Sequence, residues 1–264
     1  PREMRPIWAD SVLPRLRERG AGEDTANRTF RLAGIGESQL ADLLGEELLR
    51  ATNPIVATYA RADAVDVRVS AIGDGATSAA ALVEIAAKHV LGIIRPYVWA
   101  EGATTWPDAI GEALEARGWS LASVEVGTGG SLAALLGDRP WLVFTESLLP
   151  DAPGATAHAD AGDAGTDPGM SEGPEAPEST AMAGLEALTR RAMAVGGGSV
   201  GVGVRGRPHG DDTAVSVVVV RPDGVHRERR LVFLGGANGR ARSALTAAAI
   251  LFARLRVHDG SEVG

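Results

Sequence analysis

The chain has 264 residues, of which 45% are hydrophobic and 23% are charged, and its formal net charge at pH 7 is -8. This composition fits a globular protein with one or two buried cores, and the acidic balance excludes a nucleic-acid binder that depends on a basic face. No cysteine, no basic-then-apolar leader and no run of about 18 apolar residues occurs, so disulfides and thiolate metal sites are excluded and we expect a cytoplasmic protein without a membrane segment.

The first expected element is a helix over residues 5–19 that ends at Gly20 and leads into a polar linker. Its apolar side chains are Ile7, Trp8, Val12 and Leu16. These side chains need a partner, since an amphipathic helix is stabilised mainly by packing of its apolar side.

The segment from Arg28 to Pro96 alternates between strand and helix patterns. Period-two or helical spacing predicts strand 29–35, helix 39–50 capped by Ser38, strands 55–60 and 65–71, and helix 77–94. This βαββα order indicates a small α+β sandwich. The segment has no basic Gly-x-x-Gly loop and more acidic than basic residues, so we expect no nucleic-acid partner.

The remainder predicts an α/β fold. We expect helix 106–117, strand 120–126, helix 129–136, strand 141–147, helix 181–194, strands 199–204, 214–220 and 226–234, and helix 240–255. A three-layer α/β sandwich with a mixed sheet accommodates this order. Residues 150–179 hold few apolar side chains, which predicts a disordered or irregular low-complexity loop.

A glycine-rich turn, Glu125-Val-Gly-Thr-Gly-Gly, joins one of these strands to the next helix. Such a turn directs backbone N–H groups toward an anion, and Gly127, Gly129 and Gly130 would permit close approach of a ligand. Glu125 either binds a ribose hydroxyl or caps backbone N–H groups. Thr128 is a candidate helix N-cap and, alternatively, a substitute nucleophile.

This turn resembles the Glu-Ser-Cys-Thr-Gly-Gly signature of the CinA C-terminal domain, the nicotinamide mononucleotide amidohydrolase family. Four positions match, while Val126 and Gly127 stand at the serine and cysteine positions. Arg28-Thr-Phe-Arg-Leu-Ala-Gly-Ile-Gly-Glu-Ser resembles the KH-like CinA middle domain, as does Asn53-Pro-Ile-Val-Ala-Thr-Tyr-Ala. Pro1-Arg-Glu-Met-Arg-Pro-Ile-Trp resembles the end of the molybdopterin-binding-like N-terminal domain. The resemblance therefore implies three parts, residues 1–26, 27–103 and 104–264.

Two further segments near the end of the chain resemble family motifs. Val204-Arg-Gly-Arg-Pro-His-Gly-Asp-Asp is similar to a Thr-Gly-x-x-Gly-Pro loop, where Arg205, Gly206 and Arg207 either hold a phosphate or are solvated. Arg242 matches the second arginine of a Gly-Asp-Arg-x-x-Val-Arg turn. The resemblance implies a pyridine mononucleotide or another phosphate-bearing small molecule as ligand, a homo-oligomer, and no metal or cofactor.

The resemblance also implies a reaction in which the serine attacks the carboxamide of nicotinamide mononucleotide, a lysine assists and ammonia leaves. Here the serine position is Val126, and the only lysine, Lys88, lies in the middle domain, where we expect a solvated surface residue. We therefore expect a degenerate, non-catalytic competence/damage-inducible-type module, a pseudoenzyme. Two alternatives stay open: an active amidohydrolase that uses unassigned residues, and a longer CinA protein with ADP-ribose pyrophosphatase activity upstream of Pro1.

Overall fold

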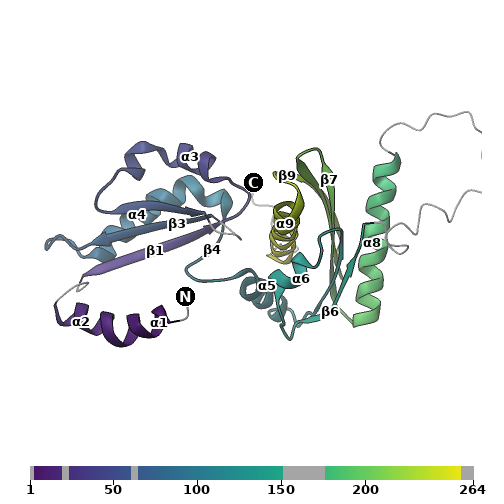
Figure 1. The fold of residues 1–264 in the computed structure, drawn as a ribbon, viewed down its shortest axis with the longest axis horizontal. Helices are drawn as coiled ribbons and strands as arrows, with labels where there is room; N and C mark the ends of the chain where they lie inside the picture. The colour runs from purple at the N-terminus through teal and green to yellow at the C-terminus, as the bar shows by residue number, and fades with distance from the viewer. Residues whose placement is uncertain (1–2, 20–23, 61–64, 151–175, 257–264) are drawn as a thin grey trace, which may run out of the picture. The chain divides into compact units, whose positions relative to one another are not determined.

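The computed structural model describes residues 3–19, 24–60, 65–150 and 176–256 (Figure 1). It forms two compact units, Pro1–Thr104 and Thr105–Gly264. Within the described residues, no helix is long and apolar enough to cross a membrane.

The first unit is a four-stranded antiparallel sheet with two long helices on one face (Figure 1). Its elements are α1 (Met4–Ile7), the π-helical turn η1 (Trp8–Val12), α2 (Leu13–Glu18), β1 (Thr25–Leu32), α3 (Glu37–Leu49), β2 (Ile55–Ala60), β3 (Val65–Ile72), α4 (Ala79–Ile94), the 3-10 turn η2 (Arg95–Tyr97) and β4 (Val98–Glu101). The strand order is β2-β3-β1-β4, the split βαβ arrangement. The predicted βαββα sandwich is confirmed, and the structure adds β4 as an edge strand.

The core of this unit lies between the sheet and the helices α3 and α4. Alternate residues of β1 and β3, among them Phe30, Leu32, Val67 and Val69, are buried against Val90 of α4 and its neighbours. The predicted cap of α3 is wrong. Ser38 lies inside this helix, and the N-cap residue is Gly36, which supplies no side-chain hydrogen bond.

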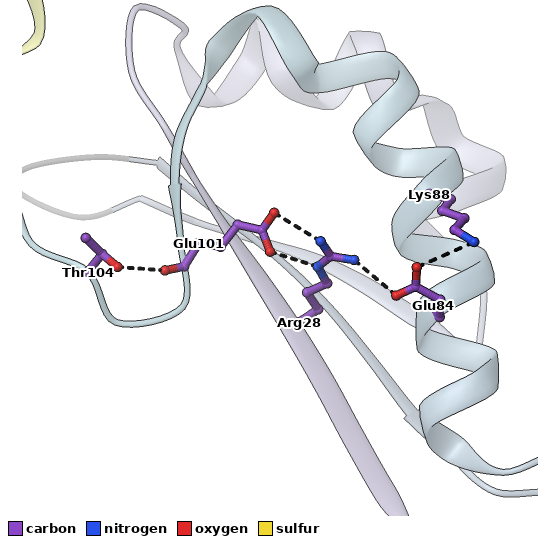
Figure 2. A network of polar contacts seen from close by, with 5 residues as sticks. All are labelled: Arg28, Glu84, Lys88, Glu101 and Thr104. Atoms are coloured by element: carbon purple, nitrogen blue, oxygen red, sulfur yellow. Dashed lines mark hydrogen bonds and ion pairs between the residues drawn. The ribbon is translucent and has the colours of Figure 1, made fainter. Parts of the chain in front are cut away.

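A polar network ties β1, β4 and α4 together at the surface of this unit (Figure 2). The guanidinium of Arg28 donates two hydrogen bonds to Glu101, at 2.8 and 3.1 Å, and a third to Glu84 at 3.1 Å. Nζ of Lys88 lies 3.6 Å from Glu84. Lys88 is therefore an exposed, ion-paired surface residue, as the sequence predicts.

The second unit is a three-layer sandwich around a five-stranded mixed sheet, which confirms the predicted architecture. Its elements are α5 (Trp106–Glu115), β5 (Leu121–Val126), α6 (Ser131–Leu136), β6 (Leu142–Leu148), α8 (Ala176–Gly196), β7 (Val200–His209), β8 (Asp212–Arg221), β9 (Gly224–Val232) and α9 (Gly236–Arg256). The strand order is β6-β5-β7-β8-β9. The first three strands are parallel and the last three form an antiparallel meander. Helix α8 covers one face of the sheet, and α5, α6 and α9 cover the other (Figure 1).

Strand β5 divides its side chains between the two faces of the sheet. Ala122, Val124 and Val126 pack with Leu185 and its neighbours on α8. Because side chains alternate along a strand, Ser123 and Glu125 point toward the opposite layer.

Two sequence-based boundaries need correction. Residues 176–179, expected in the low-complexity loop, belong to α8, whereas residues 151–175 of that loop lie outside the described residues. Arg205 to His209, expected in a loop, extend β7 and pair with β8 as far as His209 opposite Asp212.

Candidate functional site

Glu125, the residue before the last in β5, is fully buried. Its Oε2 accepts hydrogen bonds from Thr128 Oγ1 at 2.6 Å and from the backbone N–H of Leu132 at 2.9 Å. Its Oε1 accepts from the N–H of Ala133, also at 2.9 Å. The carboxylate thus caps the first turn of α6, where orphan N–H groups and the helix dipole favour a negative charge. Of the two predicted roles for Glu125, the geometry is that of the structural cap.

Thr128 is not the helix N-cap that the sequence favours. Its hydroxyl donates to Glu125, and its carbonyl accepts from the hydroxyl of Ser131 at 2.7 Å. Gly130 occupies the N-cap position with φ 79°. The cap of α6 therefore comes from the preceding strand, not from the turn.

The backbone conformation of the turn requires glycine at three positions. Gly127, Gly129 and Gly130 have φ angles of 74°, 64° and 79°, in the left-handed region that favours glycine. A Cβ added to Gly127 would lie only 2.5 Å from the carbonyl oxygen of Gly206. No nucleophilic side chain fits at this position, because the turn lies directly against β7.

Val126, at the position of the signature serine, is 1% exposed and belongs to the apolar layer under α8. It stands opposite Arg205 of β7 in the parallel register, so the two side chains share a face of the sheet. Glu125 and Arg205 consequently lie on opposite faces. They do not meet in one site.

The two candidate arginines of β7 have different environments. Arg205 is 4% exposed, and its Nη1 donates to the carbonyl of Ala181 on α8 at 3.2 Å. Burial lowers the pKa of its guanidinium, and the nearby charge of Arg207 lowers it further. Arg207 itself is exposed, as is Arg242 on α9. A Cβ added to Gly206 would point to the opposite face of the sheet from Arg205. It would lie 3.3 Å from side-chain atoms of both Thr128 and Ser243.

Arg240 is a residue that the motif comparison did not select. A Cβ on Gly129 would lie 3.5 Å from its Cδ and Nε, so this side chain lies beside the turn. One feature of the sequence could have pointed to Arg240. A positive charge in the first turns of a helix interacts unfavourably with the helix dipole, so an arginine at this position suggests a role other than stabilising the helix. Arg240 thus places a cationic side chain beside the glycine turn.

The loop before α9 contains a strained residue. Leu234 has φ 75°, the left-handed conformation that a branched side chain rarely adopts. Its N–H donates to Asp212 at 3.1 Å and its carbonyl accepts from Thr213 at 3.0 Å. These two bonds hold the loop that leads to Arg240.

Replacing Leu234→Gly should raise the free energy of unfolding by about 1 kcal/mol, because glycine adopts this conformation without the steric cost. Chemical denaturation measures the change. The matched control is Leu231→Gly in β9, which should lower stability by about 1 kcal/mol through the unfolded-state entropy of glycine. Equal losses for both variants would contradict strain at Leu234.

No group of three or more His, Asp or Glu side chains within the described ranges is placed to hold a metal ion. The site therefore consists of a capped helix, a close-packed glycine turn and neighbouring arginines. Its buried carboxylate and hydroxyls are bonded within the protein.

Comparison with known proteins shows which of them this chain resembles. The sequence model of the damage-inducible protein CinA KH domain matches residues 27–100. A CinA-like protein of Deinococcus radiodurans is 41% identical over 140 residues, which are 53% of this chain and 33% of the relative. A CinA-like protein of Deinococcus deserti is 42% identical over 140 residues, 53% of this chain and 34% of the relative.

The chain thus spans about a third of the length of these curated relatives. The match to a solved structure of a CinA superfamily protein from Klebsiella pneumoniae covers 57% of this chain and 95% of that protein, with a TM-score of 0.40 and 19% identity. The KH-domain match places residues 27–100 in the CinA KH domain family, and over about half of its length the chain is similar to these Deinococcus CinA-like proteins.

Proposed function

We propose that the second unit of this chain keeps the scaffold of a nicotinamide-nucleotide amidohydrolase without its chemistry, as a non-catalytic module. The observation that carries the proposal is the use of Glu125: all three of its hydrogen bonds go to the chain's own turn and helix. The neighbouring Val126 belongs to an apolar layer and offers no nucleophilic atom.

Amide hydrolysis needs a nucleophile, a base and donors for the oxyanion. The N–H groups of Leu132 and Ala133 already donate to Glu125, so they do not receive an oxyanion. The hydroxyls near the turn are engaged as well: that of Thr128 with Glu125, and that of Ser123 with Thr145 at 2.9 Å. These contacts favour the non-catalytic module. They argue against the alternative, an active amidohydrolase that uses other residues.

A pyridine mononucleotide or another phosphate-bearing small molecule stays the predicted ligand, and a homo-oligomer stays the predicted assembly. The carboxylate of Glu125 occupies the end of α6, so we assign the anion to the guanidinium group of Arg240, which lies beside Gly129 and is exposed. Binding through one exposed arginine gives an affinity in roughly the millimolar range, about 4 kcal/mol.

The test is release of ammonia from nicotinamide mononucleotide by purified residues 1–264 in a coupled assay. We expect turnover below about 0.1 s⁻¹, under the ordinary enzyme range. A CinA family protein that keeps the signature serine is the positive control. The variant Val126→Ser should stay inactive, because its hydroxyl would face the layer under α8 without a base. Turnover above this level by the unmodified chain would refute the proposal.

A further inference from the structure

Strand β2 forms a sheet edge without charged side chains. In the described part of the chain, the sheet edges are β2, β4, β6 and β9. The other three edges are charged: Glu101 lies in β4, Glu146 in β6, and Arg229 among several charges in β9. Charged side chains are one means by which proteins prevent an edge strand from pairing with another chain. Strand β2, Ile55-Val-Ala-Thr-Tyr-Ala, has none, so its sequence permits such pairing.

The outer side of β2 has no partner strand within the described residues. On its inner side, β2 pairs with β3 along its whole length. Alternate N–H and C=O groups of an edge strand point outward, where another strand can bind them. Val56 points into the core, so Ile55 and Tyr59 lie on the opposite face of the sheet, where they are 49% and 48% exposed. The next strand carries Arg68 on this face, so the exposed apolar surface is a rim along β2.

We propose that β2 pairs antiparallel with β2 of a second copy of the chain, which joins two four-stranded sheets into one continuous sheet. This interface rests on the homo-oligomer proposed above and names the surface through which it forms. It is independent of the proposed loss of catalysis, which concerns the second unit. A two-fold axis makes the interface isologous, so the same strand supplies both sides.

The positions of the apolar side chains favour one register, with the two-fold axis at Ala57. In this register Ile55 of each copy faces Tyr59 of the other, and a β-branched side chain opposite an aromatic ring stabilises adjacent strands. An axis at Thr58 would leave Ile55 beyond the end of the other β2, and an axis at Val56 would do the same to Tyr59. Only the axis at Ala57 among these three pairs both exposed apolar residues.

The charge of the edge favours a second copy over a charged peptide as the occupant. An acidic or basic peptide finds no ion-pair partner on β2, whereas a second copy brings an equally uncharged strand. Arg68 stands opposite Ala57 within the sheet. The two Arg68 backbones would therefore lie three strand spacings apart, about 14 Å, beyond the Debye length of about 8 Å.

The length of the seam predicts a weak and reversible dimer. Each copy contributes the six residues of β2, whereas a standard stable interface involves roughly 20–30 residues a side. We therefore expect a dissociation constant of roughly 10–100 μM, which corresponds to about 5–7 kcal/mol.

Sedimentation equilibrium of the full chain tests this interface. Ala57→Lys should weaken dimerisation at least about tenfold, because two ammonium groups would face each other across the axis. The matched control is Ala80→Lys on the exposed side of α4, which should leave dimerisation unchanged. Ala57→Asp should weaken dimerisation like Ala57→Lys. An equimolar mixture of these two variants should dimerise at least about tenfold more tightly than either alone, because opposite charges then face each other.

The mixture separates a lost contact from lost folding, since unfolded variants would not recover a dimer. Equal dimerisation of Ala57→Lys and the unmodified chain, or a mixture no tighter than either variant, would overturn this interface and leave the homo-oligomer in place. An unmodified chain that stays monomeric up to about 500 μM, well above the expected dissociation constant, would overturn both. The ammonia assay judges the loss of catalysis separately.

Discussion

Replacing Glu125→Ala should lower the free energy of unfolding of the second unit by about 3 kcal/mol. The carboxylate is fully buried and accepts three hydrogen bonds, two of them from backbone N–H groups of α6. Alanine leaves these donors buried without their acceptor and leaves a cavity, and each unsatisfied donor costs about 1–3 kcal/mol. Denaturant unfolding monitored by circular dichroism measures the loss.

Thr128→Val is the matched control, because it removes one donor and keeps the cap of α6. It should cost about 1 kcal/mol, the ordinary value of one hydrogen bond. A loss below about 1 kcal/mol for Glu125→Ala would mean that the carboxylate is not the structural cap and that a ligand-binding role has to be reconsidered.

Replacing Asp66→Ala should destabilise the first unit by about 3–5 kcal/mol. Nε of Arg31 lies 3.3 Å from Asp66, and the two side chains are 7% and 3% exposed. The guanidinium also donates to the carbonyl of Thr104 at 2.5 Å and lies 5.2 Å from the ring of Trp99. Without Asp66 the positive charge stays buried and loses its carboxylate, and breaking such a pair typically costs this much.

Two further variants separate this effect from the loss of any ion pair. Glu46→Ala removes the exposed pair with Arg50, at 80% and 76% exposure, and should change stability by less than about 0.5 kcal/mol. The double variant Arg31→Met/Asp66→Leu should recover much of the loss, because it removes both charges. A double variant as unstable as Asp66→Ala would show that packing, not charge, governs this position.

The sequence predicts those helices and strands in which apolar residues recur at regular spacing along the whole element. Helix α4 begins within two residues of its predicted start, since Val83, Ala87, Val90 and Ile94 keep helical spacing. Strand β4 was missed because four residues between Pro96 and Gly102 are too few to show an alternation.

The extension of β7 was missed for another reason. Gly206 and Pro208 are typical of a loop, and a proline disrupts a strand that has neighbours on both sides. Strand β5, however, ends at Val126 opposite Arg205, so residues beyond Arg205 pair with β8 alone. Pro208 is tolerated because no strand on the β5 side needs its missing N–H. Sequence patterns do not reveal where a neighbouring strand stops.

The candidate site was located by its motif, but its contacts were not predictable. Adjacent positions of a strand face opposite sides, which already separates Glu125 from Val126. The register that places Arg205 beside Val126 depends on strands far apart in the chain. Arg240 reaches the turn from α9, a contact that no local pattern carries.

The strand order of the second unit has a kinetic consequence. Ser120 and Ser199, which directly precede β5 and β7, are hydrogen-bonded although they are 79 positions apart. The meander β7-β8-β9 needs only short turns, whereas the β5–β7 pair requires closure of a long loop before its contacts form. During synthesis β5 and β6 therefore leave the ribosome before their central partner exists, with Ala122, Val124 and Val126 uncovered. Before β7 emerges, this unit exposes apolar side chains and an unpaired strand edge, and it is then most prone to aggregation. Chaperone binding should therefore protect the nascent chain most at this stage.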